Sequence, residues 1–239
     1  MLKKRAAEPE LMDAAGFDRN LAEESFRFIA VVNRWFGGVR AVRRFVAAEA
    51  AHGPRDRALR VLDVGSGSCD IPIAVCAWAR GRRIPVDFTC IENSEHAVRI
   101  ARRNLRRNPD LPITLIRGDI FAHQPEAPYD CAVGSMFFHH LAENDIMRLI
   151  DRLRGFVRSS LLINDLQRSP ANYAACRLLL PAFPFEVGHD ALLSIRKGFR
   201  AAELKDLLEG LQDAAVSVSS APLFRIRAVV RFIGVAPCA

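Results

Sequence analysis

Short apolar runs alternate with amphipathic segments along the middle of the chain, between residues 59 and 166. Short runs bounded by turn residues predict buried strands, and apolar residues at three- and four-residue spacing predict helices. The predicted strands cover 59–65, 86–92, 113–119, 129–135 and 159–166. The predicted helices between them cover 70–80, 94–108 and 143–157. Short strands that alternate with helices favour a parallel sheet covered on both faces.

Two further helices are predicted before this region. Apolar residues step by three and four from Phe28 to Val46, which indicates a helical stripe over residues 20–50. Gly37 and Gly38 interrupt the stripe. Because glycine is a poor helix former, we expect two helices rather than one.

The end of the chain shows a different pattern. A helix is predicted over 201–211, and strands are predicted at 214–220 and 224–235 with a short turn between them. In the last strand, Phe224, Ile226, Ala228, Val230 and Phe232 alternate with Arg225, Arg227 and Arg231. This alternation predicts a half-exposed strand that pairs antiparallel with its neighbour at the edge of the sheet.

The composition is ordinary for a globular protein, with 50% hydrophobic and 26% charged residues among 239. No apolar run is long enough to span a bilayer, and no apolar stretch follows the basic N-terminus, so neither a membrane span nor a secretory signal is expected. The cysteines lack metal-binding spacing, which favours buried free thiols in a reducing cytoplasm and no metal site. They are Cys69, Cys76, Cys90, Cys131, Cys176 and Cys238.

The net charge of +7 makes RNA a partner to consider. The densest arginine cluster, between residues 99 and 107, recurs at helical spacing opposite Ala97, Ala101 and Leu105. This spacing favours the solvated face of a helix over a nucleic-acid site.

A glycine-rich turn follows the first predicted strand, in the sequence RVLDVGSGSCD at 60–70. Gly65 and Gly67 let the backbone approach a ligand where a Cβ atom would collide. In open parallel sheets, ligands bind at the carboxyl ends of the strands where the strand order reverses. The alternative interpretation is a tight turn without a ligand.

Acidic residues mark the ends of the next two strands. Glu92 is placed to accept both hydroxyls of a ribose, and Asp119 to accept from the exocyclic amine of adenine, with Ile120 beside the ring. A dinucleotide would need a third glycine at position 70, but Asp70 stands there, and an acid at a helix N-terminus repels a pyrophosphate. The pattern therefore indicates a cofactor with adenine, ribose and a cationic tail, whose ammonium or sulfonium Asp63 suits.

Residues 58–165 resemble the core of class I S-adenosylmethionine-dependent methyltransferases. The family's motifs match Asp63, Gly65 and Gly67 in the glycine-rich turn, Glu92 as the ribose acid, Asp119 as the adenine acid, and 134–140 as the fourth motif. Cys69 stands where the family's third glycine falls. The stretches SFRFIAVVNRWFGG, FFHHL, INDLQRS and HDALLSIRKGF resemble small bacterial methyltransferases of polyketide-type or aromatic secondary metabolism.

The resemblance implies an α/β, Rossmann-like fold: a seven-stranded, mostly parallel sheet with an antiparallel last strand and helices on both faces. We expect an N-terminal helical cap at 1–57 and a cofactor-binding core at 58–239, with a lid inserted at about 167–200. The implied cofactor is S-adenosylmethionine. Its candidate binding residues are Asp63, Gly65, Ser66, Gly67, Asp70, Glu92, Asn93, Asp119, Ile120 and Ser135.

Methyl transfer often needs a base that removes a proton from the acceptor. His139 and His140 follow the fourth strand and are the catalytic candidates, because imidazole titrates near neutral pH. Alternatively, one of them caps the next helix and the other packs in the core. The segment LLLPAFPF at 178–185 predicts an apolar lid, or a helix that completes the core. The candidate acceptor-binding residues are Trp35, Asn164, Asp165 and His189.

These features favour methyl transfer to a hydroxyl of an apolar aromatic, polyketide- or quinone-like small molecule, or to a carbon of a similar molecule. An RNA methyltransferase is less favoured, since the Asn/Asp-Pro-Pro-aromatic motif does not follow the fourth strand. A non-catalytic scaffold would not need the complete set of acids, and a dehydrogenase would need the missing glycine. We expect a cytoplasmic monomer or homodimer with no nucleic-acid partner and no integral membrane association.

Overall fold

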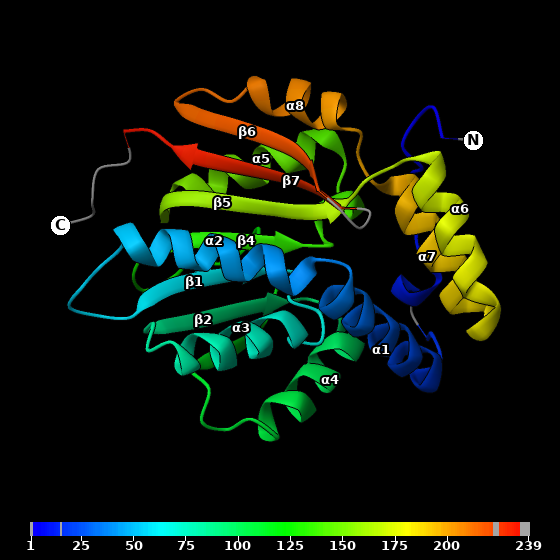
Figure 1. Cartoon of the computed structure of the whole chain (residues 1–239), viewed down its shortest axis with the longest axis horizontal. Coiled ribbons are helices and arrows are strands. Elements are labelled where there is room, and N and C mark those ends of the chain that lie inside the picture. Colours follow the sequence, from blue (N-terminus) through cyan, green and yellow to red (C-terminus); the bar gives the residue numbers. More distant parts are fainter. Residues whose placement is uncertain (1, 15, 222–224, 235–239) are drawn as a thin grey trace.

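A seven-stranded sheet forms the centre of the computed structural model, which describes residues 2–14, 16–221 and 225–234 (Figure 1). The strand order is β3-β2-β1-β4-β5-β7-β6. The strands are β1 (Leu59–Val64), β2 (Val86–Glu92), β3 (Ile113–Arg117), β4 (Tyr129–Ser135), β5 (Val157–Leu166), β6 (Ala214–Ala221) and β7 (Arg225–Phe232).

Strands β1 to β5 run parallel, and β7 runs antiparallel to both β5 and β6. The predicted sheet, seven-stranded and mostly parallel with an antiparallel last strand, is confirmed. β6, not the last strand β7, forms the edge opposite β3, because β7 is inserted between β6 and β5. The strand order reverses between β1 and β4, so the functional site is expected at the carboxyl ends of these strands.

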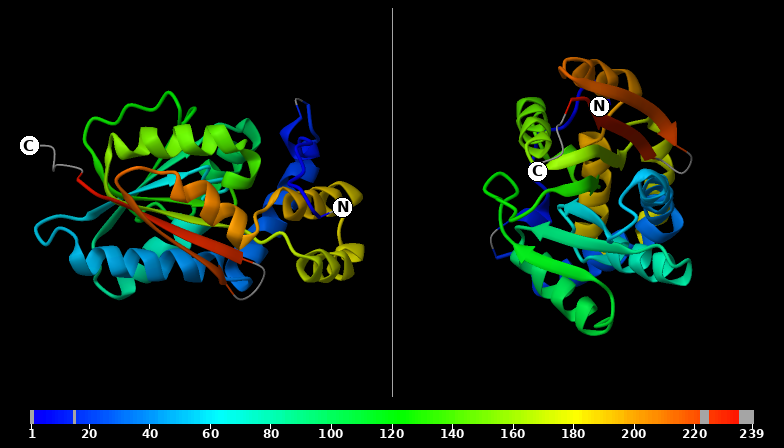
Figure 2. Two further views of the ribbon diagram at one scale, coloured as in Figure 1. Left: turned by 90° about the horizontal axis from the view of Figure 1, so that it is seen from above. Right: turned by 90° about the vertical axis from the view of Figure 1, so that its left-hand side faces the viewer.

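Helices cover both faces of the sheet, with α2 and α5 on opposite sides (Figure 2). Val46 of α2, Val75 of α3 and Ala101 of α4 belong to the core on one face. Leu149 of α5 and Leu204 of α8 belong to the core on the other. The helices are η1 (Leu11–Asp13), α1 (Arg19–Trp35), α2 (Gly38–His52), α3 (Asp70–Gly81), α4 (Glu95–Arg106), η2 (Phe138–His140), α5 (Glu143–Arg154), α6 (Pro170–Leu179), η3 (Leu180–Ala182), α7 (Phe185–Lys197) and α8 (Ala201–Glu209).

The carboxyl edge of the sheet faces α1, η1 and a helical hairpin of α6 and α7, at the right in Figure 1. The hairpin is formed by the segment for which the sequence predicts a lid. α2 packs instead on the sheet, against α3 and β5. Of the two long N-terminal helices, only α1 therefore lies over the carboxyl edge.

Gly37 and Gly38 separate α1 from α2, as the sequence predicts. Gly37 has a φ of +87°, a left-handed conformation that favours glycine. A Cβ atom at Gly38 would lie 2.8 Å from Asn33 Oδ1. The two glycines together allow the sharp turn by which the chain passes from α1 to the layer of helices on the sheet.

The last strand departs from the expected alternation at Arg225. This residue was predicted on the exposed side of the strand, but it is only 1% exposed. Its Nη2 donates to Asn33 Oδ1 at 2.9 Å, and its Nε donates to the Phe36 carbonyl oxygen at 3.3 Å. The end of α1 covers the start of β7, a contact between residues 192 positions apart that no local pattern marks.

Most of the cysteines are buried free thiols, as predicted. Cys69, Cys76, Cys90 and Cys131 are buried, and Cys176 is half-buried. Burial raises the pKa of the Cys76 thiol to about 12. The predictions for Cys238 and Phe224 lie outside the described residues.

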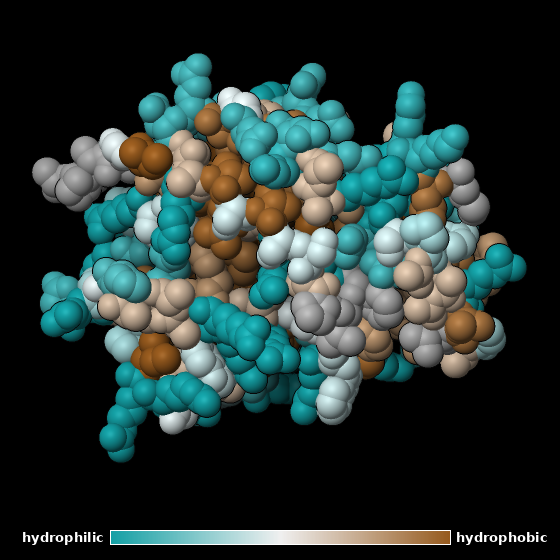
Figure 3. Space-filling model, turned by 45° about the horizontal axis from the view of Figure 1, so that its top comes forward, coloured by the Kyte–Doolittle hydropathy of each residue, from teal (hydrophilic) through white to brown (hydrophobic). Residues whose placement is uncertain are grey.

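No described helix is both long and apolar enough to cross a membrane. On the face drawn in Figure 3, polar side chains surround the apolar ones.

Leu149 tests the core beneath α5, because its side chain is fully buried there. Leu149→Ala is expected to lower the free energy of unfolding by about 2–5 kcal/mol, since it leaves a cavity. Leu178 is 82% exposed, so Leu178→Ala is a matched control that should change stability by less than about 0.5 kcal/mol. Urea unfolding followed by circular dichroism measures both. Equal effects of the two variants would contradict the packing of α5 on the sheet.

Candidate functional site

A cavity of about 1410 Å³ lies at the carboxyl edge of the sheet. All ten residues that the sequence marks as cofactor-binding line it, and so do His139 and His140. Much of the remaining lining is apolar and includes Phe28, Phe137 and Phe183. Residues from the first and last thirds of the sequence therefore meet in one space.

The glycine-rich turn between β1 and α3 takes left-handed conformations at three positions. The φ angle is +65° at Gly65, +54° at Gly67 and +58° at Cys69. A Cβ atom at Gly65 would lie 2.1 Å from the Phe137 ring, so the protein's own packing requires glycine there. Cys69, in the place of the family's third glycine, is fully buried and holds the same backbone conformation despite its side chain.

Glu92 ties this turn to the start of α4. Its Oε2 accepts a hydrogen bond from the Gly67 amide, and its Oε1 accepts one from the Ser94 amide, both at 2.8 Å. Each carboxylate oxygen has a second lone pair, so Glu92 can hold the turn and still accept from ligand hydroxyls in the cavity.

Asp63 and Asp70 add two carboxylates to the same part of the cavity. Burial, reinforced by the nearby Asp70 and Glu92 carboxylates, holds the pKa of Asp63 well above its usual range. Burial also raises the pKa of Asp70, although Asn33 Nδ2 and Ser68 Oγ each donate to it at 3.0 Å. Three neighbouring acids in the lining of one cavity favour a positively charged ligand.

Arg225 belongs to this site, although the sequence pattern did not mark it. Arg225 lines the cavity, and Asn33 connects it to Asp70. The Asn33 side chain accepts from Arg225 through Oδ1 and donates to Asp70 through Nδ2. Burial lowers the pKa of Arg225 to about 10. The three residues join β7, α1 and α3 directly beside the glycine-rich turn.

The ends of β3 and β4 complete the lining expected for the cofactor. Asp119 Oδ1 accepts from the Phe121 amide at 2.9 Å, and Ile120 is buried. Ser135 Oγ accepts from Asn164 Nδ2 at 2.8 Å.

His139 is held rigidly by Asp165. Its Nδ1 lies 2.6 Å from Asp165 Oδ1, and its amide donates to Asp165 Oδ2 at 3.0 Å. His139 Nε2 is buried and has no hydrogen-bond partner among the residues that the structure describes. Burial lowers the pKa of His139, but the carboxylates of Asp165 and Glu10 outweigh it and raise the value to about 9. Burial raises the pKa of Asp165, and His139 and backbone amides overcome this to lower it to about 2.

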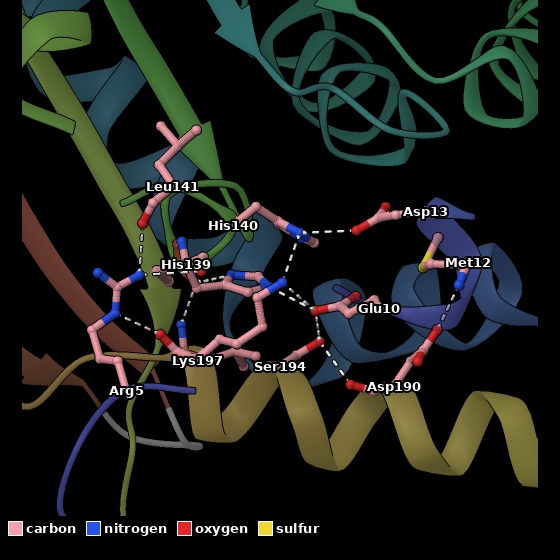
Figure 4. Close-up of polar contacts among 12 residues, drawn as sticks. Arg5, Glu10, Met12, Asp13, His139, His140, Leu141, Asp190, Ser194 and Lys197 are labelled. Atoms are coloured by element: carbon pink, nitrogen blue, oxygen red, sulfur yellow. Dashed lines mark hydrogen bonds and ion pairs between the residues drawn. The ribbon is translucent and has the colours of Figure 1, made fainter. Parts of the chain in front are cut away.

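Glu10 is the main site residue that the sequence did not reveal. It is 4% exposed and lies between His139, Ser194 and Lys197 (Figure 4). Ser194 Oγ donates to Glu10 Oε1 at 2.7 Å, and His139 Nε2 lies 3.7 Å from the same oxygen. An acid between Pro9 and Leu11 has no local pattern that marks it as functional.

His140 occupies a more open position than His139. Its side chain is 30% exposed, and its Nδ1 lies 3.6 Å from Asp13 Oδ2. Glu10, His139 and His140 bring one ligand atom each within 4.8 Å of one another, a spacing that a metal ion can use. Lys197 Nζ already lies 3.5 Å from His140 Nδ1 and 3.7 Å from Glu10 Oε1, which favours the protein's own ammonium over a metal ion.

The four acceptor-binding candidates lie outside the lining of the cavity. Trp35 is 67% exposed at the end of α1. His189 lies beside Asp190, with 42% of its side chain exposed. Asn164 and Asp165 are fully buried behind Ser135 and His139, which they contact.

Comparison with known proteins relates the middle of the chain to one family. Residues 61–160 match the family model of a methyltransferase domain. The chain matches no curated protein sequence.

Solved structures share the fold over almost the whole chain. The plantazolicin methyltransferase BpumL, in complex with S-adenosylhomocysteine, is 15% identical with a TM-score of 0.64, over 90% of this chain and 95% of that one. The magnesium protoporphyrin IX methyltransferase of Synechocystis PCC 6803, with bound S-adenosylmethionine, is 15% identical with a TM-score of 0.55, over 95% and 99%. At such identities the similarity establishes the fold.

The His139–Asp165 pair gives the stability of the protein a defined pH dependence. Because the pKa of His139 rises from 6.5 to about 9 on folding, its stabilising contribution is fully present below about pH 6.5 and is lost as the pH rises through about 9. Asp165→Asn is expected to flatten this decline, whereas Asp145→Asn on the surface should retain it. Urea unfolding at stepped pH measures all three proteins. A wild-type decline no steeper than that of Asp165→Asn would contradict the assignment.

Proposed function

Because residues 61–160 match the family model of a methyltransferase domain, and the fold is shared with methyltransferases solved with S-adenosylmethionine or S-adenosylhomocysteine, we propose that the protein methylates a hydroxyl of an apolar aromatic, polyketide- or quinone-like small molecule. The observation that carries this proposal is His139 Nε2, a buried nitrogen that has no hydrogen-bond partner among the described residues and belongs to a residue that lines the same cavity as the cofactor candidates.

The residues around the glycine-rich turn fit the cofactor. Asp63 and Asp70 line the cavity side by side, and their carboxyl groups suit the cofactor's ammonium and sulfonium. Glu92 is placed to accept from the ribose hydroxyls, and Asp119 and Ile120 to contact the adenine. When bound, S-adenosylmethionine supplies an electrophilic methyl group on sulfur.

His139 is the base in this proposal. Asp165 accepts the Nδ1 proton of the neutral ring, which leaves the lone pair on Nε2. Nε2 takes the hydroxyl proton of the acceptor as the acceptor oxygen forms its bond to the methyl carbon and the carbon–sulfur bond breaks. The products are a methyl ether and S-adenosylhomocysteine, with the proton on His139. Asp165 acts through His139 and is a positioning residue.

The size and lining of the cavity support an apolar acceptor. A volume of about 1410 Å³ exceeds the roughly 300–1,000 Å³ of an ordinary ligand pocket, so an acceptor has room beside the cofactor. Phe28 of α1 and Phe183 after η3 pack edge to face, with ring centres 4.9 Å apart, and both line the cavity. In this proposal, α1 and the hairpin of α6 and α7 form the cover over the acceptor, and α2 belongs to the core.

Separate substitution of His139 and His140 tests which of the two histidines is the base. His139→Ala is expected to lower kcat by about 10²–10⁴-fold, because it removes the proton acceptor, while the Kd for S-adenosylmethionine stays within about twofold. His140→Ala is the matched control and should lower kcat by less than about tenfold, since His140 lies between Asp13 and Lys197. A panel of phenols and hydroxyquinones, with methylated products quantified by mass spectrometry, provides the assay. Full turnover in His139→Ala would remove His139 from the mechanism.

A further inference from the structure

The N-terminal segment from Arg5 to Asp13 crosses the carboxyl edge of the sheet and is fixed there by contacts distant in sequence. Arg5 Nη2 donates to the carbonyl oxygens of His139 at 3.1 Å and Leu141 at 3.0 Å, on either side of the end of η2. Asp190 of α7 accepts from the Leu11 amide at 2.8 Å and from the next amide at 2.9 Å. The segment is therefore bound both to the loop that carries the proposed base and to the lid hairpin.

Glu10 lies between these two anchors and points into the cluster beneath (Figure 4). Its side chain is 3% exposed, and Ser194 Oγ donates to it at 2.7 Å. Its Oε1 lies 3.7 Å from His139 Nε2, too far for a hydrogen bond but close enough for a strong electrostatic interaction. The Glu10 carboxylate therefore acts on Nε2 through its negative charge rather than through a hydrogen bond.

We propose that Glu10 is a positioning residue of the methyl-transfer site: the N-terminal segment brings its carboxylate to the Nε2 side of His139, where it strengthens the imidazole as a base. This inference rests on the proposed function, in which His139 accepts the hydroxyl proton. Asp165 then forms a hydrogen bond with the ring at Nδ1, and Glu10 acts on the ring at Nε2 by its charge.

Charged groups on several elements face His139, and their sum decides how strong a base it is. Asp165 of β5 and Glu10 of the N-terminal segment favour the protonated ring. Lys197 of α7, close to Glu10, opposes them in part. The ring of His140 lies 4.2 Å from that of His139, and His140 is itself close to Asp13 of η1 and to Lys197. Arg5 meets the His139 carbonyl oxygen rather than the ring.

A stronger base has two opposite effects on the rate. More of it is protonated at neutral pH, so less is ready to accept a proton. The deprotonated fraction removes the acceptor proton faster, because proton abstraction follows base strength. Loss of Glu10 is therefore expected to shift the acid limb of the pH–rate profile to lower pH and to lower the plateau at high pH.

The first test follows the His139 ring directly, by NMR of protein with ¹⁵N-labelled histidine and no acceptor, assigned against His139→Ala. Glu10→Gln is expected to lower the pKa of His139 by about 1 or more, since it removes a facing carboxylate. Glu10→Asp, which keeps the charge on a shorter side chain, should give a smaller decrease. Glu8→Gln is the matched control in the same segment, because Glu8 is exposed and pairs with Arg196, and it should leave His139 unchanged.

The second test is the pH dependence of kcat/KM and kcat for the same variants, with the phenol of the panel that the wild-type protein methylates fastest. Both expected changes in Glu10→Gln, with neither in Glu8→Gln, would support the proposal. A lower melting temperature with an unshifted His139 titration and an unshifted acid limb would overturn it, because Glu10 would then be structural only. Should the wild-type protein bind S-adenosylmethionine but methylate no hydroxyl, the proposed function fails, and the catalytic part of Glu10 with it, whatever the titration shows.

Discussion

Three neighbouring carboxyl groups in one cavity form the constraint on which the cofactor end of the molecule depends. Asp63 lies next to the last residue of β1, Glu92 ends β2 and Asp70 begins α3, and the parallel sheet brings all three to one edge. Their burial and mutual repulsion make the charged state of Asp63 unfavourable, which is why its pKa is raised. A ligand with an ammonium and a sulfonium relieves this repulsion, whereas a pyrophosphate would increase it. The packing of the turn thus selects the charge of the cofactor.

The part of the cavity around His139 depends instead on an attraction, between the His139 ring and the Asp165 carboxylate. Asp165 at the end of β5 fixes the backbone and the ring of His139 after β4, so the imidazole stays in place without help from a ligand. The reversal of strand order between β1 and β4 puts this pair and the acid cluster in one cavity. Apolar side chains from α1 and from the segment after η3, among them Phe28 and Phe183, line the same cavity. In the proposed reaction, this topology brings methyl donor, acceptor and base together.

Site residues at the ends of strands could be predicted from the sequence, because a short apolar run marks each strand locally. Glu92, Asp119 and His139 each follow a short apolar run, and a parallel sheet places such residues at one edge. Glu10 and Arg225 could not be found this way, since their partners lie 129 to 192 positions away in the chain. Trp35 shows the converse: it continues the apolar stripe of α1, yet it is the last residue of that helix and lies at the surface.

Isothermal titration calorimetry with S-adenosylmethionine, in two buffers of different ionisation enthalpy, tests most directly whether the acid cluster is a site for a cationic cofactor. We expect saturable binding with release of a proton, because the ligand's positive charge lowers the pKa of Asp63. Asp63→Asn should abolish the proton release, and NAD, which carries a pyrophosphate, should not bind. Failure of the wild-type protein to bind S-adenosylmethionine, or binding of NAD in its place, would contradict the account.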